Sequence, residues 1–253
     1  MKAYACKNKD EQIRLQSSSG GIFSLLAEEI LKESGIVIGA SWEGLEVKHI
    51  AIDNKDDLYK LRGSKYVKSK VCYSLLNTDR LVLFSGTPCQ MPISKDNLLL
   101  VDVVCHGTPK TEVFNEYCKK YGIKKINFRD KTNGWLNYQV VTETEKETKK
   151  ENFYENDYMN MFLSNKHLNE SCYNCKFKNF KSNSDIQIGD FWGIQNEYPD
   201  FFDNKGISLV MVKTPKGEGY FERIKPHMDY IEVDIEKAIK YNPCIVKSVT
   251  KGI

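Results

Sequence analysis

The sequence lacks a long apolar run and a strong excess of either charge. No apolar stretch approaches the roughly 20 residues of a membrane-spanning helix. The opening MKAYACKNKDEQIRLQ also lacks the apolar core of a secretory signal. The 253 residues include 37 Lys and Arg against 34 Asp and Glu, a balance that favours neither nucleic acid nor an anionic membrane as a partner. We therefore expect a cytoplasmic protein with no membrane span and no nucleic-acid partner.

The chain also lacks internal repeats, low-complexity tracts and a Pro- or Gly-rich linker, while its 41% apolar content is enough for a sizeable core. Helical and strand patterns alternate along it, which predicts the α/β class (α+β, with a mixed sheet). Helices are expected near residues 17–35, 55–63, 110–122, 156–165, 216–227 and 234–241. Strands are expected near residues 36–42, 45–52, 80–84, 98–104, 123–130, 135–144, 184–193 and 206–214.

Three local patterns carry further expectations. The stretches 80–84 and 98–104 are apolar almost throughout, as parallel strands buried on both faces are. The hydroxyls at Ser17–Ser19 are expected to cap the helix that follows them. The mixed-sign run at 142–151 predicts a solvated hairpin tip or strand end.

The eight cysteines are the most informative residues, because in a cytoplasmic protein they indicate metal binding or redox chemistry more than disulfides. Cys172 and Cys175 form a CxxC pair, a spacing that serves zinc, iron–sulfur clusters and redox dithiols alike. A second CxxC is absent, so further ligands must come from elsewhere. Cys89 and Cys105 each follow a predicted buried strand, and parallel strands deliver their ends to one edge of a sheet.

These four thiols would complete either a zinc or an iron–sulfur site, and their spacing does not separate the two. Alternatively, Cys89 and Cys105 are small buried hydrophobes. The other four cysteines, Cys6, Cys72, Cys118 and Cys244, are interpreted as structural or incidental.

Two loops suit a phosphate group. SSSGG, at residues 17–21, brings hydroxyls and unhindered N–H groups to a predicted helix N-terminus. LRGSKYVKS, at residues 61–69, offers Arg62, Lys65 and Lys68 to a diphosphate. The simpler interpretations are an ordinary serine cap and an exposed basic loop.

Three further positions are more ambiguous. His106 directly follows Cys105 and could orient a cofactor, although no catalytic role is assigned to it. Asp190, in IGDFWG, is expected to cap the following helix. Phe191 and Trp192 are either core residues or a platform for a planar ring.

Taken together, several of these stretches resemble a known family. They are SSSGGIFSLLAEEIL, LRGSKYV, LFSGTPCQ, VDVVCHGTP, INFRDKTNGW, LNESCYNCKFKN, SDIQIGDFWGI and DNKGISLVMVKTPKGE, in this order along the chain. The chain resembles the beta-subunit family of deazaflavin-reducing hydrogenases and dehydrogenases, which includes plant hydroxymethyl-chlorophyll reductase. The resemblance runs from about Tyr4 to about Val249.

The resemblance implies an oxidoreductase that contains FAD and an iron–sulfur cluster and passes electrons to or from a two-electron partner. It implies a flavin-binding part at 1–80 and a cysteine-bearing part at 81–253 within one compact domain. Cys89, Cys105, Cys172 and Cys175 would hold a four-iron four-sulfur cluster. The FAD site would include Ser18, Ser19, Gly20, Gly21, Arg62, Gly63, Ser64 and Lys65, with Thr87 near the cluster or the flavin.

The chain also departs from the family. The N-terminal ferredoxin domain of many members is missing, so we expect a ferredoxin, or a protein with such a domain, as the electron partner, beside an unidentified small-molecule redox substrate. Lys176, Lys178 and Lys181 would dock an acidic ferredoxin, or serve only solubility. The segments MPISKDN and VCYSLLNTDR look short beside the proposed site. The alternative function is therefore a catalytically degenerate member that acts as a metal-stabilised binding or assembly protein.

Overall fold

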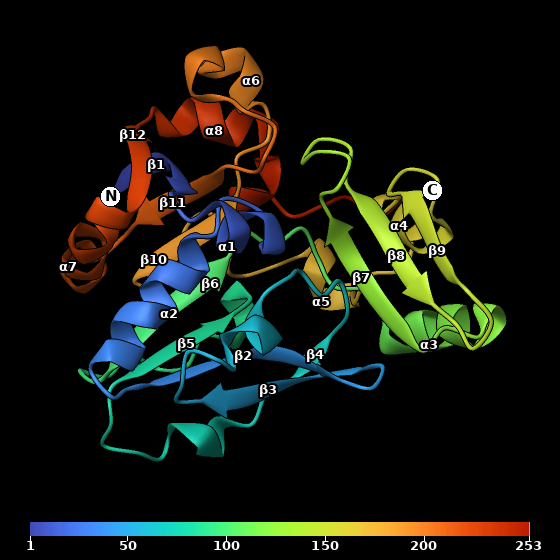
Figure 1. The fold of residues 1–253 in the computed structure, drawn as a ribbon, viewed down its shortest axis with the longest axis horizontal. Coiled ribbons are helices and arrows are strands. Elements are labelled where there is room, and N and C mark those ends of the chain that lie inside the picture. Colours follow the sequence, from blue (N-terminus) through green and yellow to red (C-terminus); the bar gives the residue numbers. More distant parts are fainter. Residues whose placement is uncertain (253) are drawn as a thin grey trace.

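The computed structural model describes residues 1–252 and confirms the predicted α/β class. Its larger sheet is mixed and has nine strands, drawn across the left half of Figure 1. In spatial order these are β12 (Met228–Glu232), β1 (Lys2–Asn8), β11 (Ser208–Val212), β10 (Ile186–Asp190), β6 (Leu98–Val103), β5 (Val82–Gly86), β2 (Ile36–Glu43), β3 (Glu46–Ile52) and β4 (Ser69–Lys70). The sheet takes strands from both sides of residue 80, so the two predicted parts share it.

The α-helices lie between and around these strands. They are α1 (Glu11–Gln16), α2 (Ile22–Lys32), α3 (Thr111–Tyr121), α4 (Asp157–Leu163), α5 (Glu170–Tyr173), α6 (Ile194–Glu197), α7 (Pro215–Ile224) and α8 (Ile235–Tyr241). No helix within residues 1–252 is both long enough and apolar enough to cross a membrane.

The core is arranged in layers on the two faces of the large sheet. Helix α2 buries Ile22, Leu26 and Ile30 against one face, together with α7. Helices α6 and α8 cover the opposite face of β1 and β11. The apolar spacing on α2 explains its position, because residues three and four apart share one side of a helix.

The predicted parallel pair is confirmed. Strand β5 pairs in parallel with β6, from Val82 opposite Leu98 to Gly86 opposite Asp102. Strand β10 pairs in parallel with β6 on its other side. The carboxyl ends of all three strands therefore meet at one edge of the sheet, which is where ligands bind in open α/β sheets.

A three-stranded antiparallel sheet forms a second layer with α3 and α4, on the right of Figure 1. It consists of β7 (Lys125–Asp130), β8 (Gln139–Glu143) and β9 (Thr148–Asn152). The turn between β8 and β9 is closed by the Thr144 N–H, which donates to Glu147 O at 2.9 Å. This confirms the solvated hairpin expected from the charged run.

Four strands, β1, β4, β9 and β12, lie outside the strand ranges predicted from the sequence. Strand β1 lies between β11 and β12, antiparallel to both. Its residues are buried on both faces, so the polar–apolar alternation that marks a half-buried strand is missing. Strand β12 is short and mostly exposed, and it has no apolar run.

Candidate functional site

A cavity of about 1100 Å³ lies at the edge where β5, β6 and β10 end. This volume is slightly above the usual range for small-molecule and cofactor sites. Its walls include the residues that directly follow these strands. Two further walls are the serine–glycine loop (residues 17–21) and the basic loop (residues 61–69). The topology thus brings together segments that are far apart in the sequence.

Nearly all the residues predicted to hold FAD line this cavity. They are Ser18, Ser19, Gly21, Arg62, Gly63, Ser64, Lys65 and Thr87. Gly20 lies behind the wall, where a Cβ atom would be 2.4 Å from Cys6 O and 2.7 Å from Ser208 N. Only glycine permits so close an approach of the loop to β1 and β11, which explains the residue at this position.

The expectation that serine hydroxyls cap α2 is wrong. The N-cap is Gly21, at φ +80°, and no side chain caps the helix. The Ser18 hydroxyl instead accepts a hydrogen bond from the Ser64 N–H at 2.7 Å, and the Ser19 hydroxyl donates to Ile207 O at 2.8 Å. Ser18 therefore ties the serine–glycine loop to the basic loop, so that the two walls hold each other.

Arg62 and Lys65 of the basic loop both line the cavity, but they differ in their hydrogen-bond partners and in how far burial lowers their pKa. Arg62 donates to the Ser24 hydroxyl at 3.0 Å and to Gln16 Oε1 at 3.1 Å, and burial lowers its pKa. The Lys65 amine donates to Arg62 O at 2.9 Å and Gly63 O at 3.0 Å. Burial lowers the pKa of Lys65 to about 8. An anion beside this amine would stabilise its charged form.

A buried ion pair supports the serine–glycine loop from inside the protein. Asp190 accepts hydrogen bonds from Arg129 Nη1 at 2.8 Å, Arg129 Nη2 at 2.9 Å and Trp135 Nε1 at 2.7 Å. Arg129 Nη2 also donates to Ser18 O at 2.8 Å. Burial acts to lower the pKa of Arg129, but the Asp190 carboxylate overcomes it and raises the pKa well above its ordinary value.

The expectation that Asp190 caps a helix is therefore wrong, because its carboxylate is fully used by Arg129 and Trp135. The N-cap of α6 is Gly193. Phe191 is a core residue, whereas Trp192 stacks on Trp135, with ring centroids 4.8 Å apart, and lines the cavity. For the pair of Arg129 and Asp190, the sequence carried only one signal: Arg129 lies in the motif INFRDKTNGW and Asp190 lies in the motif IGDFWG.

Lys131 is a second supporting residue that sequence reasoning missed. Its buried amine donates to the carbonyls of Arg14 at 2.7 Å, Ser19 at 2.9 Å and Lys205 at 2.7 Å. Burial lowers the pKa of Lys131 to about 7, and the neighbouring Arg129 acts in the same direction. The amine joins three chain segments behind the serine–glycine loop.

Three of the four cysteines predicted to bind a cluster line the same cavity. Cys89 and Cys105 follow β5 and β6 as expected, and they line the cavity together with Cys172. Cys175 is half-buried, and its N–H donates to the Ser248 hydroxyl at 2.9 Å. Burial raises the pKa of Cys105 to about 12, and Cys89 and Cys172 add to this, so the thiols are close enough to interact.

The donor chemistry of these four thiols fits a four-iron cluster, which takes cysteine thiolates as ligands. Within residues 1–252, however, no three His, Cys, Asp or Glu side chains already converge as a metal-binding group. Three of the four thiols border one cavity, and all four would have to converge further to share a metal.

Lys178 and Cys244 belong to this region too. The Lys178 amine donates to Cys105 O at 2.5 Å and to Cys244 O at 2.6 Å, so it is not the free docking cation that its sequence position suggested. Cys244 lines the cavity, unlike the buried Cys6 and Cys118 and the exposed Cys72. No motif or spacing in the sequence marks Cys244.

Two histidines also line the cavity. His106 Nε2 lies 2.6 Å from Asn165 Oδ1, and His49 Nε2 lies 2.9 Å from Ser85 O. Burial is the main factor that lowers the pKa of each imidazole. Both rings are therefore held in place in their neutral form near pH 7.

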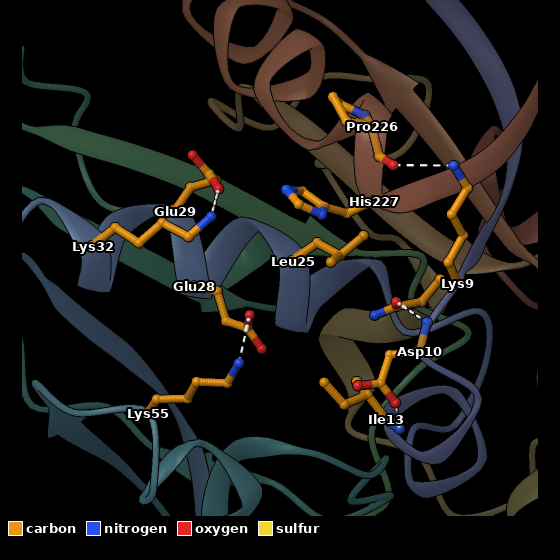
Figure 2. Close-up of a pocket in the computed structure, with 11 residues that line it drawn as sticks. Lys9, Asp10, Ile13, Leu25, Glu28, Glu29, Lys32, Lys55, Pro226 and His227 are labelled. Atoms are coloured by element: carbon orange, nitrogen blue, oxygen red, sulfur yellow. Dashed lines mark hydrogen bonds and ion pairs between the residues drawn. The ribbon is translucent and has the colours of Figure 1, made fainter.

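A smaller cavity of about 220 Å³ lies between α2 and the Pro226–His227 turn, shown in Figure 2. Two of its carboxylates already have cationic partners: Lys55 pairs with Glu28 at 3.0 Å, and Lys32 pairs with Glu29. None of the predicted flavin or cysteine residues lines it.

Comparison with known proteins identifies the family and agrees with the fold. Residues 3–76 match the family model for the N-terminal part of the coenzyme F420 hydrogenase/dehydrogenase beta subunit, and residues 79–238 match the model for its C-terminal part. Among solved structures, a chain of the F420-reducing nickel–iron hydrogenase complex from Methanosarcina barkeri is similar, with a TM-score of 0.63 and 16% identity. The match covers 96% of this chain and 90% of that one. No curated protein matches the chain.

Proposed function

Because the chain belongs to the coenzyme F420 hydrogenase/dehydrogenase beta-subunit family, we propose that it is an iron–sulfur flavoprotein oxidoreductase. It would pass electrons between a four-iron four-sulfur cluster, FAD and a two-electron donor or acceptor. One observation carries the proposal: both predicted flavin loops and three of the four predicted cluster cysteines line a single cavity. Two carriers held in one cavity can exchange electrons directly.

The residues around the cavity support a diphosphate at the N-terminus of α2. Gly21 presents unhindered backbone there, where the helix dipole favours a negative charge. Arg62 and Lys65 would add positive charge from the neighbouring loop. Arg129 and Lys131 would act as positioning residues, because both bind carbonyls of the serine–glycine loop from behind.

The cysteines and Lys178 support a cluster next to the flavin. Cys89, Cys105, Cys172 and Cys175 would supply the thiolates. Burial raises the pKa of Cys105 and of Cys172, and the Lys178 ammonium acts in the opposite direction on both. A fixed cation of this kind favours thiolates and offsets the negative charge of a cluster.

When bound, FAD accepts two electrons as a hydride and releases them singly, whereas a cluster accepts one electron at a time. The chain's own part is to hold both groups and to keep water away from them. Tyr138, Phe153 and Trp192 supply an apolar wall of the cavity for the second task. His49 and His106 would orient groups as neutral donors or acceptors, and no proton transfer is assigned to either.

An electron partner is part of the proposal, with a ferredoxin or a ferredoxin-domain protein as the expected class. The exposed Lys176 and Lys181 flank the CxxC segment and would attract an acidic surface. The similar solved structure is itself a multi-subunit hydrogenase complex. The two-electron partner would be a small redox molecule that reaches the same cavity.

The test is the absorption spectrum and the iron, zinc and flavin contents of anaerobically purified protein, beside Cys175→Ala and the matched control Cys118→Ala. Flavin and cluster absorbance, with iron lost only in Cys175→Ala, would support the proposal. Cys118 is buried in α3, away from the cavity, so its substitution should leave both cofactors in place. A colourless protein that contains zinc and no flavin would refute the redox function and favour a metal-stabilised binding or assembly protein.

A further inference from the structure

Cys244 lies in the short 3₁₀ turn Pro243–Ile245, which closely follows α8, and it lines the same cavity as Cys89, Cys105 and Cys172. It is half-buried. The turn is distant in sequence from all four predicted ligands. Its presence at the cavity therefore depends entirely on how the C-terminal segment folds back over the CxxC segment.

Two hydrogen-bonded links hold the C-terminal segment against the cysteines. The Lys178 amine contacts both Cys105 O, at 2.5 Å, and Cys244 O, at 2.6 Å, so these two carbonyls lie within about 5 Å of each other. The Cys175 N–H donates to the Ser248 hydroxyl at 2.9 Å. The backbone of Cys244 is thus fixed next to that of Cys105.

The five thiols of this region differ in their exposure to solvent. Cys89 is exposed, whereas Cys105, Cys172, Cys175 and Cys244 are half-buried. An exposed thiolate is the ligand that solvent, oxidants and competing metals reach first. A half-buried thiol beside the same metal could replace it without changing the charge of the site, since each contributes one thiolate.

We propose that Cys244 is a fifth metal-binding thiol of this site, placed to replace Cys89 as a ligand of iron or zinc. The inference rests on the cysteine site of the proposed function. In this arrangement Cys105, Cys172 and Cys175 hold the metal permanently, and Cys89 and Cys244 are alternative fourth ligands. The exchange of one thiolate for the other transfers no electrons, and the incoming thiol releases its proton to solvent.

The test uses Co²⁺ as the probe on the metal-free full chain, because thiolate ligation to cobalt is visible in the absorption spectrum without iron or flavin. The variants are Cys89→Ser, Cys244→Ser and the double substitution, with the exposed Cys72→Ser as the matched control. Alkylation of each cysteine by iodoacetamide, followed by mass spectrometry, shows which thiols the metal protects. Circular dichroism checks that each variant is folded.

We expect Cys89→Ser to keep Co²⁺ binding, with Cys244 becoming protected from alkylation when the metal is added. The double variant should bind at least about tenfold more weakly than either single variant, the scale on which even outer-shell partners of metal ligands act. Cys72→Ser should behave as the unsubstituted protein does. If Cys89→Ser binds as weakly as the double variant, and Cys244 alkylates equally fast with and without metal, the proposal is wrong.

These outcomes separate this inference from the proposed function. Protein with iron and flavin but with Cys244 never protected would retain the redox function and remove the fifth ligand. If the protein contains neither iron nor flavin, but Co²⁺ protects Cys244 in the Cys89→Ser variant, the redox function is refuted and Cys244 is retained as a fifth metal-binding thiol.

Discussion

The buried pair of Arg129 and Asp190 gives the sharpest prediction for stability. The side chains are 1% and 15% exposed, and the guanidinium and carboxylate are joined by two hydrogen bonds. Asp190→Asn keeps the size of the side chain but leaves the guanidinium without its counter-charge. Removing one partner of a buried pair costs about 3–5 kcal/mol, a large share of the roughly 5–15 kcal/mol that stabilises a domain.

The assay is urea denaturation at neutral pH, supported by thermal unfolding. The expected loss corresponds to a fall in Tm of roughly 6–20 °C for a chain of this size. The matched control is Glu218→Gln, which removes a carboxylate from the exposed Lys2–Glu218 pair. That substitution should have little effect on either measurement, because solvent screens an exposed pair.

A companion variant tests the reason for the loss. Arg129→Met/Asp190→Leu removes both charges, so it should recover part of the stability that Asp190→Asn loses. The reasoning would be refuted if Asp190→Asn unfolds within about 1 kcal/mol of the unsubstituted protein. It would be refuted equally if the double variant were less stable than Asp190→Asn, because the cost would then lie in lost packing.

Three other predictions follow from the same structure. Gly20→Ala should destabilise by at least about 1–3 kcal/mol in urea, since its Cβ would overlap Cys6 O. Gly219→Ala is the control and should not destabilise the protein, because a Cβ atom there meets nothing within 4 Å. Equal losses of stability in the two variants would contradict this account. ADP should bind more weakly as pH rises through about 8, where Lys65 loses its charge, and calorimetry should find Lys65→Met free of this dependence. Burial raises the pKa of Asp102, so the native state keeps a proton that the unfolded chain loses above about pH 4. Stability should therefore fall as pH rises from there. Asp102→Asn should make Tm depend less on pH. If the dependence of Tm on pH is unchanged in this variant, groups other than Asp102 cause it.

Much of the cavity lining was predictable, because local sequence patterns mark the segments that form it. Cys89 and Cys105 end apolar strands, and the parallel pairing of β5 and β6 brings such ends to one edge. The residues of the serine–glycine and basic loops were likewise identified from glycines, hydroxyls and cations at expected turns. Their roles were less predictable. The sequence indicated that the Ser18 hydroxyl would cap the helix, but in the structure this hydroxyl accepts a hydrogen bond from the Ser64 N–H.

The sequence by itself determined the type of most elements and the segments that border the cavity. Burial is periodic along helices and strands, and so the spacing of apolar residues in the sequence indicates the type of each element. Only the tertiary structure decided which distant groups meet. Asp190 binds Arg129 rather than capping a helix, Lys178 joins Cys105 to Cys244, and β1 lies between β11 and β12. These contacts join residues 60 or more positions apart, where neither spacing nor propensity specifies a partner. The packing of the whole chain selects it.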